Sequence, residues 1–272
     1  TAQVGRFPLD WEGDFYATDF AGYMMNDAYV TDYDPMATAV WFKKPFEMGS
    51  FEMFVAHDED DYMTDYYRYG ARLAFSFNEN LSAAANYVKY DYKDAEDYST
   101  LWGDLIVNFN ENVAFKAQYF TQDWEEWSEN PAAWKAILTF SQDMLKYTDL
   151  WIEYAQIDDG FTFKNDAYGW AGSSPFLHEG DWGYYVDQDT TILNVVAHQK
   201  WNDQWWTYVR YINVDADADW HSYTGYTASV RYNYTPNLWF ELGYDKIDLD
   251  HEWRASRYEG DNMVWFRTTV NF

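Results

Sequence analysis

The sequence contains no cysteine among its 272 residues, which excludes both a disulfide framework and a thiolate metal site. It is also poor in bases, because 18 Lys and Arg stand against 46 Asp and Glu, for a formal net charge of −28. Nucleic acid binding needs a basic surface, so this balance excludes nucleic acid as a partner. Long apolar runs are absent too: a stretch such as 37–42 is far shorter than the roughly 18 residues of a membrane-spanning helix.

Aromatic residues, in contrast, are abundant at 22 % of the chain, which indicates a folded protein because disordered acidic chains are poor in them. Several segments alternate between apolar and polar residues with a period of two, the pattern of a β-strand with two unlike faces. In 66–78 Arg68 and Arg72 take one parity, and the other parity holds Tyr67, Tyr69, Leu73, Phe75 and Phe77. The segments 113–119 and 224–234 alternate in the same way.

The breaks between these runs are of two kinds that alternate along the chain. One kind is short, and the tetrapeptide Phe-Asn-Glu-Asn occurs in it twice, at 77–80 and 109–112. The other kind is longer and acidic, and its segments hold 35 of the 46 carboxylates. They are 10–35, 58–65, 94–97, 123–131, 158–189, 215–219 and 245–261. This alternation predicts a meander of hairpins with tight turns at one end and long loops at the other.

We expect about fourteen strands in one domain that spans 1–272. Their predicted ranges are 2–9, 36–46, 50–57, 66–78, 81–93, 98–110, 113–122, 132–141, 148–157, 190–201, 204–214, 221–234, 237–247 and 262–272. The alternation slips near Tyr87, which predicts either a β-bulge there or the entry of the strand into the rim of the barrel. A soluble sandwich would alternate too, but its strands are typically about six residues long, and most of these runs are about twice that. Strands of this length with aromatic apolar faces predict an all-β, transmembrane, antiparallel up-and-down barrel.

The last strand is amphipathic, with Thr268, Val270 and the terminal Phe272 on one parity and Arg267 on the other. It resembles the C-terminal signal of bacterial outer-membrane proteins, which the barrel-assembly machinery reads. The resemblance places the chain in the outer membrane of a diderm bacterium and puts the C-terminus on the periplasmic side. The short turns then face the periplasm and the acidic loops face outward, of which 158–189 is the longest.

Most bases lie in the predicted strands, where a charge facing lipid at mid-membrane costs roughly 2–4 kcal/mol. The strand bases should therefore face the interior, and their parity agrees for seven of the strand bases. These bases are Arg68, Arg72, Lys116, Lys135, Arg210, Arg231 and Arg267. A charged interior indicates a water-filled pore.

A strand that ends in Gly5-Arg6 is followed by an acidic loop, 10–35, that contains no Lys or Arg. This arrangement resembles the general diffusion porins, and the Tyr- and Trp-rich, Cys-free character also resembles the porins joined to S-layer-homology domains in diderm Firmicutes. The first resemblance implies that Arg6 belongs to an arginine cluster at a constriction and that the loop folds inward to present carboxylates. The candidate facing acids are Asp10, Glu12, Asp14 and Asp19. In that family strands precede the Gly-Arg strand, so sixteen strands are expected if N-terminal strands are missing here.

The resemblance further implies a homotrimer in contact with lipid and lipopolysaccharide. The expected function is passive diffusion of small hydrophilic solutes and ions, with a mild cation preference from the acidic loops. Two alternatives stay open: a solute-selective channel, for example for sugars, with inward aromatics such as Trp102, Tyr208 and Trp239, and a structural anchor or adhesin. His178-Glu179 and His251-Glu252 lack a second zinc-binding His, so no enzyme and no cofactor are predicted. Calcium is the one metal expected, at Asp215, Asp217 and Asp219, and the acidic run 58–61 is a second candidate for it.

Overall fold

The computed structural model describes residues 1–7, 19–20, 23–24, 37–59, 65–93, 96–125, 130–145, 148–161, 189–217, 222–249 and 262–271. Within them, fourteen strands form one sheet in the order β1, then β4 through β16. The bounds are β1 (Ala2–Phe7), β4 (Ala37–Phe46), β5 (Gly49–Glu59), β6 (Asp65–Asn78), β7 (Leu81–Tyr92), β8 (Tyr98–Asn110), β9 (Val113–Trp124), β10 (Ala132–Phe140), β11 (Asp149–Ile157), β12 (Thr190–Lys200), β13 (Trp205–Ala216), β14 (Tyr223–Thr235), β15 (Leu238–Leu249) and β16 (Asn262–Val270).

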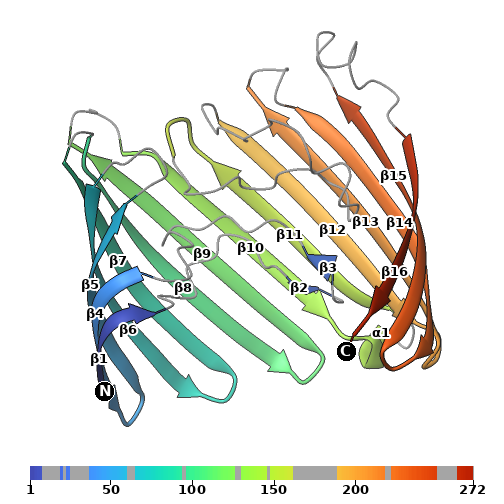
Figure 1. Cartoon of the computed structure of the whole chain (residues 1–272), viewed down its shortest axis with the longest axis horizontal. Coiled ribbons are helices and arrows are strands. Elements are labelled where there is room, and N and C mark those ends of the chain that lie inside the picture. The colour runs from blue at the N-terminus through green and yellow to red at the C-terminus, as the bar shows by residue number, and fades with distance from the viewer. Residues whose placement is uncertain are drawn as a thin grey trace.

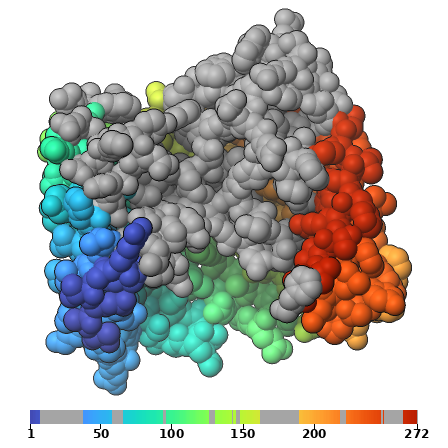
Figure 2. All heavy atoms as spheres, viewed as in Figure 1, coloured from blue at the N-terminus to red at the C-terminus, as the bar shows by residue number. Residues whose placement is uncertain are grey.

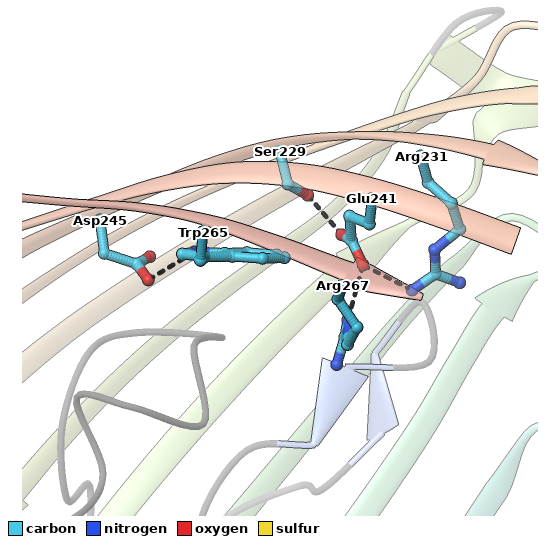
Figure 3. A network of polar contacts seen from close by, with 6 residues as sticks. All are labelled: Ser229, Arg231, Glu241, Asp245, Trp265 and Arg267. Carbon is cyan, nitrogen blue, oxygen red and sulfur yellow. Dashed lines mark hydrogen bonds and ion pairs between the residues drawn. The ribbon is translucent and has the colours of Figure 1, made fainter. Parts of the chain in front are cut away.

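Two smaller elements complete the described part. The strands β2 (Asp19–Phe20) and β3 (Tyr23–Met24) pair with each other in a separate hairpin. In Figures 1 and 3 this hairpin lies on the concave side of the large sheet, near β16. A single helical turn, α1 (Gln142–Leu145), joins β10 to β11, where the sequence predicts only a turn. Among the described residues no helix is both long enough and apolar enough to cross a membrane.

Each strand of the large sheet is antiparallel to its neighbour, which confirms the predicted up-and-down topology. The sheet curves around a concave face, and its two edges, β1 and β16, stand on opposite sides of the molecule (Figure 1). The space-filling view shows the same separation between the blue edge and the red edge (Figure 2). Within the described sheet β1 and β16 are not paired with each other.

The two faces of the sheet have the burial pattern predicted for a membrane barrel. Arg68 is fully buried whereas the adjacent Tyr69 is 38 % exposed, and Arg231 is 6 % exposed whereas Val230 is 43 % exposed. Because the side-chain period of a strand is two, the buried polar set faces the concave side and the exposed apolar set faces outward. A soluble protein buries its apolar face, so this inversion indicates that the outer face contacts lipid.

Exposed apolar residues also mark the height of the outer band. Tyr69 and Phe77, Leu101 and Phe109, and Tyr226 and Tyr234 are outward pairs on β6, β8 and β14. The members of each pair are separated by eight positions, which is about 27 Å along a strand and about 20 Å along the barrel axis at a tilt of about 40°. That height is close to the apolar band of about 25 Å in outer-membrane barrels.

The repeated Phe-Asn-Glu-Asn segments form two of the tight turns, as predicted. Asn78 Oδ1 accepts a 2.8 Å hydrogen bond from the backbone N–H of Asn80, and Asn110 Oδ1 accepts the equivalent 2.8 Å bond from Asn112. The backbone carbonyl of Asn80 also accepts the N–H of Asn108, at 2.8 Å, so the first turn is tied to the next hairpin. The asparagines therefore close the turns and join them into a rim, which we call the turn end of the sheet.

The predicted bulge at Tyr87 is wrong, because β7 pairs without interruption through that residue. The register shifts lie instead at the turn end, after Ser76, Asn108 and Asn233. The apparent slip arises because Val88 and Tyr90 are apolar yet face inward, where both are fully buried. The inner face is thus apolar and packed toward the end opposite the turns, which we call the loop end.

Candidate functional site: the inner wall of the sheet

The inner wall has two zones that differ in chemistry. Toward the loop end, side chains from many strands pack into one buried apolar cluster. It includes Phe54, Val88, Tyr90, Trp102, Phe120, Ile192, Val196, Tyr208, Ile212 and Val214. Ring stacking extends it, with centroids 4.8 Å apart for Tyr90 and Tyr98 and 4.4 Å apart for Tyr98 and Trp124. The expectation of a charged, watery interior along the whole height is therefore corrected: this zone is a packed core.

All seven bases predicted to face inward lie on the inner parity. Arg68 and Lys135 are fully buried, and Arg210 and Arg231 are 3 % and 6 % exposed. Arg72, Lys116 and Arg267 are half-buried, nearer the turn end. Arg210 Nε donates a 3.1 Å hydrogen bond to Asn194 Oδ1 on β12, which shows how such a base is held within the wall.

Arg6 differs from this group. The register of β1 pairs it with Thr38, and cross-strand partners share a face. Its neighbours Gly5 and Phe7 pair with Ala39 and Ala37, and Ala39 and Phe7 are buried. Arg6 is exposed and belongs to the outward parity, so the structure does not bring it together with the inner bases. Gly5 has a φ of +133°, a conformation that favours glycine, and this is what requires the glycine of the Gly-Arg pair.

Toward the turn end the wall is polar and bordered by cavities. A cavity of about 160 Å³ is lined by Arg72 on β6, Asp104 on β8 and Lys116 on β9. The Asp104 carboxylate accepts hydrogen bonds from Asn86 Nδ2 at 2.8 Å and Gln118 Nε2 at 2.6 Å. These bonds fix the one carboxylate between the two half-buried bases, so this part of the wall carries a net positive charge.

A larger cavity, about 760 Å³, lies at the turn end of β7 to β11. It is lined by Glu79 and Glu111 of the repeated turns, by Asp149 and Trp151 of β11, and by the asparagine amides, with no Lys or Arg in its lining. Trp151 is held in place because its Nε1 donates a 3.0 Å hydrogen bond to the buried carboxylate of Glu153. This sector of the wall is therefore acidic and rich in groups that bond to water and hydroxyls.

A third cavity, about 490 Å³, lies at the turn end of β13 to β16 and is bordered by Arg231, Trp206 and Trp239. Beside it, Glu241 Oε2 accepts bonds from Arg267 at 2.6 Å and Arg231 at 3.5 Å, and Glu241 Oε1 accepts one from Ser229 Oγ at 2.6 Å (Figure 3). This sector combines aromatic rings with guanidinium groups, in contrast to the acidic sector on β7 to β11.

Sequence reasoning missed the inward acids that organise these sectors. Asp104, Glu153 and Glu241 occupy the same parity as the inner bases, so the alternation that found the bases also contained them. They were overlooked because 35 of the 46 carboxylates lie in the acidic loop segments, so the acids were assigned to the loops as a group. Of the three inward aromatics suggested for sugar contact, Trp102 and Tyr208 are each 1 % exposed within the packed zone. Trp239 alone of these three borders a described cavity.

Several predicted residues lie outside the described part. These are Asp10, Glu12, Asp14, Asp219 and Phe272, and for Asp19 only the backbone, in β2, is described. Val270 and Thr268 are exposed on the outward parity of β16, as predicted. Asp215 and Asp217 are exposed at the loop end of β13. The described residues contain no group of three or more His, Cys, Asp or Glu placed to hold a metal, so calcium at 215–219 stays a prediction.

The curved antiparallel sheet, its outward apolar band and its polar inner cavities define the class: a transmembrane β-barrel of the porin type. No protein-family model and no curated protein matches the sequence. Solved structures do match. The outer membrane protein OprD from Pseudomonas aeruginosa has a TM-score of 0.50 at 12 % identity, over 87 % of this chain and 69 % of that chain.

Two further structures match more completely. OccK11 (OpdR) of Pseudomonas aeruginosa has a TM-score of 0.55 at 8 % identity, over 100 % of this chain and 77 % of that chain. OccAB1 of Acinetobacter baumannii has a TM-score of 0.54 at 11 % identity, over 98 % of this chain and 72 % of that chain. At these identities the likeness shows the fold, which is that of the OprD/Occ outer-membrane porins. The predicted fold and the resemblance to porins are thereby confirmed, and these neighbours are channels rather than enzymes.

Proposed function

We propose that this chain forms the wall of an outer-membrane channel through which small hydrophilic solutes and ions diffuse passively. The observation that carries the proposal is the pairing of an exposed apolar outer face with an inner wall on which charged side chains border three cavities. Charges on that wall avoid lipid and are stabilised by water and by one another. The porin fold supports the same function.

The proposal requires a closed wall, because an open sheet edge leaves backbone groups unsatisfied in lipid. β1 runs toward the loop end and β16 toward the turn end, so an even number of further antiparallel strands can join them. We propose that additional strands complete the barrel, as the sequence resemblance led us to expect. This agrees with the comparison, since the chain spans 69–77 % of the three solved structures described above.

Planar-bilayer recording of the purified, detergent-folded protein tests the proposal. Stepwise conductance that is ohmic and is not blocked by millimolar sugar supports passive diffusion. A protein that inserts into vesicles, as shown by heat-modifiable electrophoretic mobility, but never conducts contradicts it. That second result supports the structural alternative, an anchor or adhesin whose barrel only holds the protein in the membrane.

A sugar-selective channel is the second candidate, and the cavity at β13 to β16 favours it. Trp206 and Trp239 border this cavity together with Gln204 and Asn233, and indole faces and amides are the groups that recognise pyranose rings. Conductance that falls in a saturable way with added disaccharide, and does so less in a Trp239→Leu variant, supports this candidate. Equal block by sugars and by inert polyols of the same size contradicts it.

We further propose a mild cation preference at low salt. It is supported by the net charge of −28 and by the acidic cavity with Glu79, Glu111 and Asp149. The homotrimer, the contact with lipopolysaccharide and the reading of the last strand by the barrel-assembly machinery stay predictions that rest on the sequence resemblance. A reversal potential that strongly favours anions contradicts the cation preference without affecting the channel proposal.

A further inference from the structure

The cluster around Glu241 joins three adjacent strands on the inner wall. Ser229 and Arg231 come from β14, Glu241 from β15 and Arg267 from β16, and all point to the concave side (Figure 3). The register brings them together, because Arg231 pairs with Glu241 and Glu241 pairs with Arg267. A residue of each strand on one parity therefore forms a short row of base, acid and base across the wall.

Indole rings hold the two guanidinium groups of this row. The Arg231 guanidinium carbon lies 4.0 Å from the ring centroid of Trp239 and 5.4 Å from that of Trp206. The Arg267 guanidinium carbon lies 4.9 Å from Trp239 and 5.5 Å from Trp265. Cation–π contacts of this kind restrict each guanidinium plane, so both groups keep their place beside the cavity.

Within this row Glu241 is the one negative charge. Its side chain is fully buried, whereas the side chains of Arg231 and Arg267 are 8 % and 30 % exposed. The row therefore holds two positive charges and one negative charge, a net charge of +1, and Arg267 is its most exposed member. Asp104 shows a different arrangement, because its carboxylate accepts hydrogen bonds from two neutral amides, those of Asn86 and Gln118.

We propose that Glu241 is a selectivity-determining residue that acts as the permanent internal counter-ion of Arg231 and Arg267. Its carboxylate occupies the place that a solute anion would otherwise take between the two guanidiniums. The proposal rests on the channel function given above and adds to it the residue that sets the charge of the β13–β16 sector. The residue acts through the arginines and need not touch the solute.

The substitution Glu241→Gln keeps the shape of the side chain and raises the net charge of the row from +1 to +2. In water, a unit charge about 8 Å from a monovalent ion changes the local concentration of that ion by about twofold. The change has opposite signs for anions and cations, so the ratio of anion to cation permeability should rise about fourfold. Salt screens this effect, and about 10 mM salt, where the Debye length is about 30 Å, gives the largest response.

Reversal potentials across a salt gradient measure this ratio. The expected order is a rise for E241Q, a fall of similar size for R267Q, and a return to within about 1.5-fold of the wild type for E241Q/R267Q. The double variant is decisive, because a merely structural role of Glu241 predicts two additive defects and no restoration. Asp143→Asn removes an exposed acid on α1 that does not line this cavity, and should leave the ratio unchanged.

An unchanged ratio in E241Q, or a double variant that keeps the ratio of E241Q, overturns the proposal. If E241Q fails to fold, R267Q still tests the same charge count, since Glu241 keeps its bonds to Arg231 and Ser229. No shift toward cations in R267Q then overturns the proposal. A wild-type protein without conductance refutes the channel function itself, whereas a conducting wild type with unresponsive variants refutes only the role of Glu241.

Discussion

Placing an arginine on the outer face at two depths of the same strand gives the sharpest energetic prediction. Leu105 and Phe109 lie on the outward parity of β8 and are 38 % and 62 % exposed. Four positions separate them, which is about 14 Å along the strand and about 10 Å in depth at a tilt of about 40°. Phe109 lies at the turn end, next to the Glu111 turn, so Leu105 lies near the middle of a band about 25 Å high.

We expect Leu105→Arg to destabilise the folded protein in lipid by about 2–4 kcal/mol and Phe109→Arg by about 0–1 kcal/mol. The cost at Leu105 arises because the guanidinium loses its hydration at mid-membrane, whereas at Phe109 it reaches the interface. The assay is a reversible urea titration in phospholipid vesicles, followed by tryptophan fluorescence. Phe109→Arg is the matched control, since both substitutions add the same side chain to the same face of one strand.

The result that refutes this reasoning is a cost below about 0.5 kcal/mol for both variants. Substitutions on a water-exposed surface typically fall in that range. Such a result would mean that Leu105 faces water, and the outward apolar set would then be an interface of a soluble protein.

Two further predictions use the same titration. Gly243→Ala should cost about 1–3 kcal/mol, because the added Cβ would overlap Cζ2 of the Trp265 ring. In the control Gly103→Ala the added Cβ would meet only the Ala84 carbonyl, at 3.8 Å, so equal costs for the two variants would contradict the close packing at Gly243. Asn110→Ala should cost about 0.5–1.5 kcal/mol, because the turn loses the 2.8 Å hydrogen bond from the Asn112 N–H, whereas the control Glu111→Gln should be nearly neutral. A larger cost for Glu111→Gln than for Asn110→Ala would show that the turn depends on the carboxylate.

Much of the fold could be predicted from the sequence, because strand parity is a local property. The strand 98–110 was predicted at its observed bounds, and the alternation in 66–78 and 224–234 gave the correct inward and outward faces. The Phe-Asn-Glu-Asn repeat indicated a turn for a local reason as well, since Asn78 and Asn110 bond to a backbone amide two positions further on.

What could not be predicted depends on contacts between distant segments. In the sequence, the inward apolar residues Val88 and Tyr90 interrupt the alternation of apolar and polar residues. The sequence of one strand does not show that the inner face is packed with apolar side chains at one end. The resemblance to porins implied an inward Arg6, but the outward face of this residue is set by its pairing with Thr38 on β4. The row of Arg231, Glu241 and Arg267 requires the register of three strands, which the sequence alone does not specify.

The most direct test of the account compares two adjacent alanines on β7. Ala84 faces inward and lines the cavity with Arg72, Asp104 and Lys116, whereas Ala85 is exposed on the outward face. The chain has no cysteine, so Ala84→Cys and Ala85→Cys each introduce a single thiol. Labelling with a charged, water-soluble thiol reagent is followed in vesicles, where only a hydrated thiol forms the reactive thiolate.

We expect rapid modification of the cysteine at 84 and protection of the cysteine at 85, although position 85 is the more exposed of the two in the chain alone. Protection at 85 should disappear when the protein is unfolded in urea. Equal or faster modification at 85 in the folded, lipid-inserted protein would contradict the claim that the apolar face touches lipid and the charged face surrounds water.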